Sequence, residues 1–388
     1  MAIHAIGEIC YINALSIKKG EYPKRILYLD TANLVEGRVC KMQEMNFTDA
    51  PSRAQRRIKN NTILYSSVRP NLKHFGIMTN MPSNVIVSTG FITIDVIDNN
   101  CFSPHYIYYL LTQQNIINYL QGIAQNGVSA YPSINPFDIA NLKFNFPSLS
   151  EQEHIASVLS NIDRKIALNR QINDNLEAMA RQLYDYWFVQ FDFSDENGRP
   201  YKSSGGKMVW NEKLKQNIPM GWIVEDISKI ADVYNGATPS TKEERNYGGN
   251  IVWITPKDLS DQKSKFVYYG ERNITQKGYD SCSTHMLPIG TVLMSSRAPI
   301  GLLSIAKSEL CTNQGFKSFV PKKETLGSYL YYYILLHIKQ IEQLGTGTTF
   351  KEISRDDVMT YPILVPKEEL LNKWAEFVFP IRVSSLCS

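Results

Sequence analysis

The hydrophobic pattern of the chain alternates between strand-like and helix-like segments. Residues 91–96 (FITIDV) alternate with a period of two and are rich in β-branched side chains, which predicts a strand. Ser103 follows as a helix N-cap with Pro104 at the first helical position, and Gly122 supplies a C-terminal stop, so one helix is expected between them. A helix of the same kind is expected at about 328–345. These segments predict a mixed α/β fold.

Five short segments near the start of the chain recur in the same order roughly 220 residues later. The clearest is 63–70 (ILYSSVRP), which matches 292–299 (VLMSSRAP). The other pairs are Ser88–Phe91 with Asn313–Phe316, Tyr106–Tyr109 with Tyr329–Tyr332, Ile134–Asp138 with Ile353–Asp357, and Ile6 and Ile9 with Ile227 and Ile230. Because all five pairs keep their order, we predict two copies of one domain, at residues 1–148 and 219–366.

A long helix is predicted between the copies, at residues 149–192. Residues 150–153 (SEQE) are expected to form a capping box at its start. A helix over 151–188 would be about 57 Å long at ~1.5 Å per residue, which suits a spacer between two domains. Asn169 and Asn173 on this helix either set the register with a partner helix or face water. Apolar residues form a seam at three- and four-residue spacing along its first half, at Ile155, Leu159, Ile162 and Ile166.

The remaining segments predict connecting and terminal elements. Residues 193–218 are polar and turn-rich and predict a linker. Residues 367–388 predict a distal helix much shorter than the central one, as if truncated. Pro380 is expected to stop that helix at about Phe379, because proline lacks the backbone donor that continues a helix.

Composition narrows the class of protein. The chain has 388 residues, of which 43% are hydrophobic and 20% charged, so it is globular and long enough for two or three domains. No apolar run is long enough to cross a membrane and no secretory signal is visible. The six cysteines have no C-x-x-C pair, which predicts free thiols in a reducing cytoplasm and no zinc site. They are Cys10, Cys40, Cys101, Cys282, Cys311 and Cys387.

Motifs of catalysis are mostly missing from the sequence. There is neither a phosphate-binding G-x-x-x-x-G-K-[ST] loop nor a G-x-G-x-x-G loop after a strand. Residues 135–137 (NPF) match part of the Asn-Pro-Pro-aromatic motif of adenine methyltransferases, but the second proline and a glycine-rich cofactor loop are absent, which favours a turn. We therefore expect no catalytic residue, no metal site and a protein that binds rather than reacts.

The distribution of charge suggests what is bound. The formal net charge is only +4, yet residues 50–94 contain no Asp or Glu and six Lys or Arg, which predicts a local positive field suited to nucleic acid. Residues 281–308 are also free of acids, although they carry fewer cations. A solvated surface with no ligand is the alternative interpretation. The candidate DNA contacts are Arg53, Arg57, Arg69 and Lys73 in the first copy, and Arg297 and Lys351 in the second.

Duplicated domains, a long spacer helix and missing catalysis together resemble the specificity subunit of type I restriction–modification systems. Residues 147–152 (PSLSEQ), 186–193 (YWFVQFDF) and 218–222 (IPMGW) are similar to family sequence at the family's places. The resemblance implies that each copy is a target-recognition domain for one half of a split double-stranded DNA site. It also implies that the helices set the spacing of the halves and dock methyltransferase subunits, here through the seam. Self-association through the seam is an alternative use of the same surface.

The resemblance places the chemistry on partner subunits. S-adenosylmethionine is expected on the methyltransferase subunits and ATP on translocating restriction subunits, with no cofactor on this chain. The short distal helix departs from the family pattern and puts full assembly in question. Two other functions stay open at this point: a self-contained DNA adenine methyltransferase, and a scaffold of duplicated modules that does not bind DNA.

Overall fold

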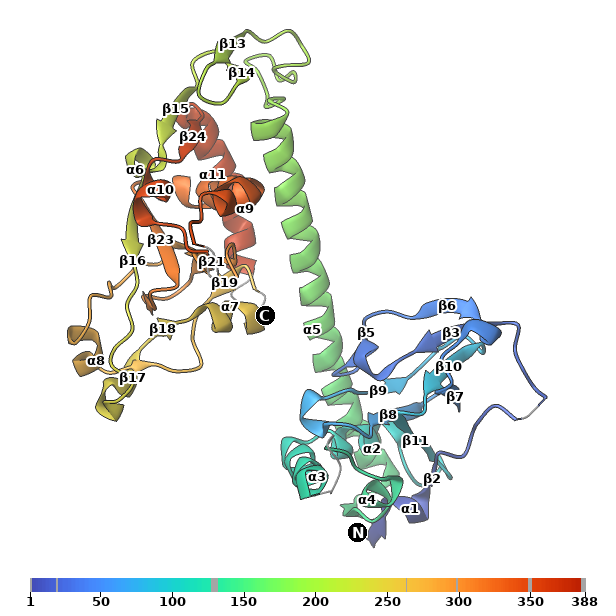
Figure 1. Cartoon of the computed structure of the whole chain (residues 1–388). Helices are drawn as coiled ribbons and strands as arrows, with labels where there is room; N and C mark the ends of the chain where they lie inside the picture. The colour runs from blue at the N-terminus through green and yellow to red at the C-terminus, as the bar shows by residue number, and fades with distance from the viewer. Residues whose placement is uncertain are drawn as a thin grey trace. The chain divides into compact units, whose positions relative to one another are not determined.

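The computed structural model describes residues 2–18, 20–126, 132–262, 264–297, 299–347 and 351–384. The chain forms two compact units, Met1–Ala167 and Leu168–Ser388, which are described separately. Each unit contains one of the two predicted copies, hereafter the first and second repeats, and a part of the long helix (Figure 1).

The first repeat contains two four-stranded sheets and four short helices. In one sheet the strand order is β2-β11-β8-β9, and in the other it is β6-β3-β10-β7. The strand predicted at 91–96 is confirmed as β11, where it pairs antiparallel with β2 and β8. The first sheet comprises β2 (Cys10–Ile12), β11 (Phe91–Val96), β8 (Thr62–Ser66) and β9 (Phe75–Met78). The second comprises β6 (Gln43–Asn46), β3 (Arg25–Leu29), β10 (Val85–Ser88) and β7 (Ala54–Arg57).

Helices cover the first of these sheets, and the ends of the repeat pair with each other. Ile63 and Ile94 from the sheet pack with Ile6, Ile107 and Leu111 from the helices in one apolar core. The elements are α1 (Ile6–Ile9), α2 (Pro104–Leu111), α3 (Gln114–Asn126) and α4 (Pro136–Ala140), and the pairing end strands are β1 (Ala2–Ala5) and β12 (Lys143–Phe146).

The single helix expected between Ser103 and Gly122 is in fact two helices. Its start is as predicted, because the Ser103 side chain accepts a hydrogen bond from the backbone N–H of Tyr106 and Pro104 is the first helical residue. The helix stops at Leu111, where the Thr112 hydroxyl donates to the carbonyl of Tyr108 and the backbone leaves the helical region. Gly122 lies inside α3 and stops nothing.

The second repeat shares one sheet, its end strands and two short helices with the first repeat, in the same order along the chain. Its five-stranded sheet has the order β16-β23-β20-β21-β19, in which the first four strands correspond to β2, β11, β8 and β9. These strands are β16 (Ala231–Asn235), β23 (Phe316–Pro321), β20 (Val292–Ser295), β21 (Leu303–Ala306) and β19 (Phe266–Val267). The end strands β15 (Ile223–Asp226) and β24 (Pro362–Val365), and the helices α6 (Ile227–Ile230) and α10 (Arg355–Met359), correspond to β1, β12, α1 and α4. The predicted duplication is confirmed.

The long central helix is α5 (Leu149–Tyr184), followed by a π-helical turn at Asp185–Val189. At ~1.5 Å per residue α5 is about 54 Å long, close to the predicted length. The capping box was expected at 150–153 but lies two residues earlier. Ser148 and Glu151 make it, because the Ser148 Oγ accepts from the Glu151 N–H while the Glu151 carboxylate accepts from the Ser148 N–H.

The distal helix α11 (Glu368–Ser384) packs within the second unit. Trp374 is fully buried there and contacts Tyr184, Phe188 and Trp187. The prediction that Pro380 ends this helix is wrong, because helical backbone continues to Ser384. Proline removes only its own N–H and one intrahelical bond, and the turns on either side keep theirs. The predicted linker contains a hairpin of β13 (Met208–Asn211) and β14 (Gln216–Pro219).

Candidate nucleic-acid interface

A serine after β8 organises three loops of the first repeat. The backbone N–H of Ser67 donates to the carbonyl of Gly90 at 2.9 Å, and the carbonyl of Ser67 accepts from the N–H of Ile134 at 2.8 Å. Val68 and Ser133 then form an isolated antiparallel bridge. These contacts, which we call the frame, join the loop after β8, the turn before β11 and the segment before α4.

The second repeat contains the same frame at the matching residues. The N–H of Ser296 donates to the carbonyl of Gly315 at 2.8 Å, and its carbonyl accepts from the N–H of Ile353 at 3.1 Å. Arg297 and Glu352 form the corresponding isolated bridge. The short segments that match in sequence are therefore the ones that make the same main-chain bonds.

Helix caps complete each frame. In the first repeat the Asn135 side chain accepts from the N–H groups of Phe137 and Asp138 and starts α4. In the second repeat the Ser354 side chain accepts from the N–H of Asp357 and starts α10. Residues 135–137, expected to form a turn, instead form the start of helix α4, with Asn135 as its N-cap and Pro136 as its first residue.

The structure brings two of the four candidate cations of the first repeat to the frame. The carbonyl of Arg53 accepts from the N–H of Thr89, next to Gly90, and the N–H of Arg69 donates to Pro132 at 2.9 Å. Arg69 has a left-handed backbone with φ of 48° and an exposed side chain.

The other two cations of the first repeat lie apart from the frame. Arg57 is at the far end of β7, where its backbone N–H bonds to the carbonyl of Leu15. Lys73 is at the far end of the 3₁₀ turn Pro70–Leu72 and pairs with Glu36 at 2.8 Å. The frame thus divides the four candidates into two near it and two away from it.

The positive field expected from residues 50–94 is partly neutralised by the fold. Four cations of that segment pair with carboxylates from outside it, which a count along the sequence could not include. The pairs are Arg53 with Asp30 at 2.7 Å, Arg57 with Glu21 at 3.8 Å, Lys59 with Asp95 at 4.0 Å and Lys73 with Glu36 at 2.8 Å. The pairs of Arg57 and Lys73 are exposed on both sides and are worth at most about 1 kcal/mol each, so a phosphate group can displace the carboxylate there. Asp95, the partner of Lys59, is buried.

Both candidate cations of the second repeat lie at its frame. Arg297 is part of the bridge to Glu352, and Lys351 is the residue before Glu352 and is exposed. Sequence analysis missed Lys317, which is buried on β23 beside this bridge, 3.6 Å from the Glu352 carboxylate. The one signal for it was a lysine between the aromatic residues of the strand at 316–320 (FKSFV).

Polar contacts tie α5 to the first repeat. The Gln152 side chain accepts from the N–H of Ser103 at 3.0 Å and donates to the carbonyls of Cys101 and Pro147. About three helical turns beyond Gln152, the Tyr109 hydroxyl donates to Asp163 at 2.6 Å. Burial and the Asp163 carboxylate both raise the pKa of Tyr109, which therefore stays protonated as a donor.

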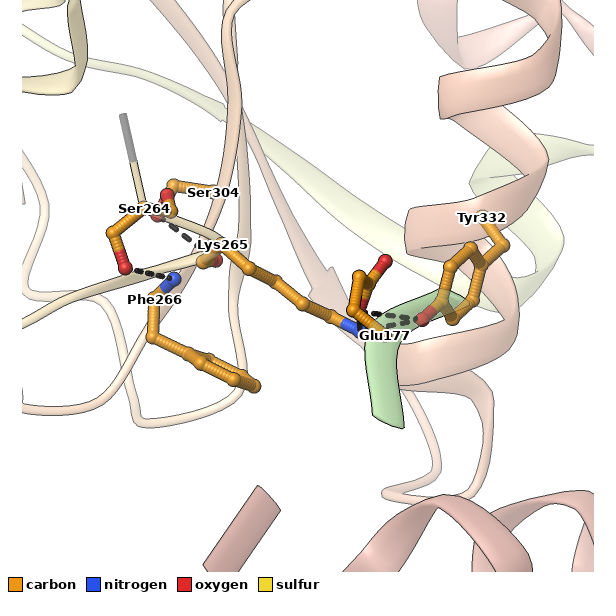
Figure 2. Close-up of polar contacts among 6 residues, drawn as sticks. All are labelled: Glu177, Ser264, Lys265, Phe266, Ser304 and Tyr332. Atoms are coloured by element: carbon orange, nitrogen blue, oxygen red, sulfur yellow. Dashed lines mark hydrogen bonds and ion pairs between the residues drawn. The ribbon is translucent and has the colours of Figure 1, made fainter. Parts of the chain in front are cut away.

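The matching tyrosine of the second repeat, Tyr332, binds the later part of the same helix. Figure 2 shows Lys265 and Tyr332 converging on Glu177: the tyrosine hydroxyl donates to the carboxylate at 2.9 Å, and the lysine Nζ lies 2.6 Å from it. The Lys265 side chain is 13% exposed, and its ammonium lies 4.4 Å from the centre of the Tyr332 ring. Tyr109 and Tyr332 thus anchor their repeats to α5 in equivalent ways.

The predicted seam, in the first half of α5, is largely exposed. Ile155, Ile162 and Ile166 are 41–49% exposed, and Leu159 is half-buried. At the start of the seam there is an open groove of about 650 Å³. The groove is lined by Tyr106, Asn145, Pro147, Ser150, Glu151, His154 and Ile155.

Neither reactive thiols nor metal ligands gather at these sites. Burial raises the pKa of Cys10 to about 12 and that of Cys311 to about 11, so both stay protonated at neutral pH. Cysteines within the described part of the chain are all free thiols, and Cys387 lies outside it. Among the described residues no group of His, Cys, Asp or Glu could hold a metal ion, and none of their helices is long and apolar enough to span a membrane.

Comparison with known protein families identifies the same domain in both repeats. The family model for the type I restriction modification DNA specificity domain matches the chain twice, over residues 3–178 and 219–380. The chain is 39% identical over 175 residues to the MjaIX type I restriction enzyme specificity subunit of Methanocaldococcus jannaschii, a match covering 44% of this chain and 40% of that protein. It is 24% identical to the HindI specificity subunit of Haemophilus influenzae, with 99% of this chain and 92% of that protein covered.

A solved structure shares the fold over almost the whole chain. The type I restriction–modification S subunit from M. genitalium superposes with a TM-score of 0.56 at 14% sequence identity, covering 98% of this chain and 89% of that one. At this identity the likeness concerns the fold alone.

Proposed function

Because the chain belongs to the type I restriction–modification DNA specificity family, we propose that it recognises a split DNA site, with each repeat contacting one half. The observation that carries this proposal is the duplicated frame, which presents cations in both repeats: Arg53 and Arg69 in the first, Arg297 and Lys351 in the second. Main-chain bonds hold the loops, and the contacts to phosphates and base edges would come from their side chains.

The exposed seam of α5 is the docking surface for methyltransferase subunits in this proposal. Each isoleucine of this row is 41–49% exposed. Covering such a row of aliphatic side chains with another protein removes apolar surface from water and is therefore favourable. S-adenosylmethionine and ATP are then used by the methyltransferase and restriction subunits in the cytoplasm, and this chain supplies recognition without catalysis.

Mapping of methylated bases tests the proposal. Cells that express this chain together with its cognate methyltransferase subunit should methylate one motif made of two defined halves separated by unspecified bases. A continuous motif, or the same methylation in cells lacking this chain, would contradict it.

A calorimetric titration of the isolated chain with S-adenosylmethionine separates recognition from enzyme activity. We expect no binding heat, because the described residues provide an N-cap where a methyltransferase would carry its catalytic asparagine. Stoichiometric binding would instead support the self-contained adenine methyltransferase.

A further inference from the structure

A lysine is buried at the frame of the second repeat, where the fold itself does not need a charge. Lys317 lies on β23, between β16 and β20, and the residue is 4% exposed. Taking an ammonium group out of water is costly unless it is paired, and burial lowers the pKa of Lys317. A buried lysine in a central strand therefore requires a compensating role.

The partners of Lys317 are the frame residues themselves. Its Nζ lies 3.6 Å from the Glu352 carboxylate and 3.4 Å from the Ser296 hydroxyl. The Glu352 backbone is fixed on two sides, by the bridge to Arg297 and by paired bonds to Thr346 at 3.0 and 3.1 Å. The carboxylate is consequently held in place by a buried cation below it, while its side chain is 47% exposed.

The first repeat shows that the frame works without these charges. By the shared main-chain bonds, Lys317 corresponds to Ile92, Glu352 to Ser133 and Arg297 to Val68. The frame distances of the two repeats nevertheless agree within a few tenths of an ångström. The charges of the second repeat therefore serve something other than the backbone arrangement.

A carboxylate beside a buried cation, on a surface proposed to face DNA, has one favourable use. It repels phosphates, but it accepts hydrogen bonds from the exocyclic amino groups that cytosine and adenine present in the major groove. Lys317 offsets the charge of Glu352 and orients it, so the repulsion from nearby phosphates is reduced.

We propose that Glu352, oriented by Lys317, accepts a hydrogen bond from an exocyclic base amino group in the half-site of the second repeat. Glu352 is thus a specificity-determining residue and Lys317 is a positioning residue. This inference rests on the proposed function, and it names the chemistry that one position of that half-site must offer: the N4 amino group of cytosine or the N6 amino group of adenine.

The test uses the full chain assembled with its methyltransferase subunit. Methylation rates are measured on oligonucleotides in which each position of the mapped motif is varied in turn. Glu352→Gln and Glu352→Ala should lower discrimination by about 5- to 150-fold at one position of the second half-site, with the first half-site unchanged. Substrates with cytosine or adenine at that position, and with each amino group removed, identify which base donates. Lys317→Met should relax the same position.

Two controls make the outcomes distinct. Glu309→Gln removes the same charge from an exposed position of the second repeat and should leave every position of the motif unchanged. Retained discrimination at the other positions of the second half-site shows that the second repeat of each variant is folded, and the exposed Glu352 variants decide the matter if Lys317→Met is unstable. Unchanged discrimination in both Glu352 variants, or an equal loss at all positions, would overturn the inference. If the wild-type complex methylates no split motif, the proposed function itself fails.

Discussion

In the first repeat the frame serine Ser67 is followed by Val68, whereas in the second Ser296 is followed by Arg297 and lies beside the buried Lys317. The main-chain bonds around the two serines are the same. The comparison teaches that the arrangement of the loops and the chemistry that they present are set by different atoms. Backbone groups fix the loops, and side chains can differ without disturbing them.

The two units also cover their parts of α5 to different extents. In the second unit Ala180 and Tyr184 are buried, in a cluster with Trp374 of α11. In the first unit the repeat buries Gln152 and Ala156, while Ile162 and Ile166 stay exposed. Both parts of the helix have a polar anchor, at Asp163 and at Glu177. The later part adds large side chains such as Tyr184 to an apolar cluster, whereas the earlier part adds the small Ala156 to one.

Exchange of the first repeat should have the largest effect. Replacing residues 1–148 with those of a relative should change one half of the methylated motif completely and leave the other half unaltered, because base contacts follow the side chains of each repeat. Methylation mapping of the chimera measures this. A chimera in which both halves change would show that the repeats do not read DNA independently.

Charges placed on the seam should abolish assembly. Leu159→Glu combined with Ile162→Glu should prevent the methyltransferase subunit from binding, or the chain from self-associating, because covering the seam would bury two carboxylates. Light scattering of the mixture reports the assembled mass. The control is Leu168→Glu, at an exposed apolar position off the seam, which should assemble normally. Normal assembly of the double variant would rule out the seam as the docking surface.

Loss of the Glu177 anchor should destabilise the second unit more than loss of the Tyr109 anchor destabilises the first. Glu177→Gln leaves the Lys265 ammonium with little solvent and no anionic partner at that position, a cost of about 1–3 kcal/mol. Tyr109→Phe removes one exposed hydrogen bond, worth about 1 kcal/mol or less. Hydrogen exchange, read separately in each unit, compares the two, and equal effects would contradict the ranking.

Removal of single phosphate contacts should have the smallest effect. Arg69→Ala and Arg297→Ala should each weaken binding to all sequences and lower the salt slope by about one. A larger loss confined to one base position would identify a base contact instead. Arg199→Ala, in the segment between the repeats, is the charge-matched control. Binding isotherms at several salt concentrations give the slopes, and unchanged slopes would show that these arginines are only solvated.

Sequence alone revealed the repeated segments, and the structure shows that these segments form the frame in both repeats. The pairs Ser67 with Ser296 and Gly90 with Gly315 lie in segments that match in sequence, and their main-chain bonds are the same in the two repeats. The break at Thr112 was not predictable, since the apolar spacing of α2 continues into α3 while the Thr112 backbone leaves the helical region.

The remaining misses came from contacts that are remote in the sequence or ambiguous within it. Both Ser148 and Ser150 precede a glutamate by three residues, so the capping box could not be placed by pattern. The acid partners of Arg53 and Lys73 lie more than 20 residues away, at Asp30 and Glu36. Lys317 was passed over because only the fold brings it to Glu352.

The frame has an evolutionary consequence that follows from its use of backbone atoms. Every amino acid except proline supplies the same N–H and C=O groups, so most substitutions at Val68, Ser133, Arg297 or Glu352 keep the bonds intact. Mutations in these loops can then accumulate under selection for new targets without passing through unfolded intermediates. Such a scaffold is highly evolvable: its lineages can diversify in what they recognise while inheriting one architecture unchanged.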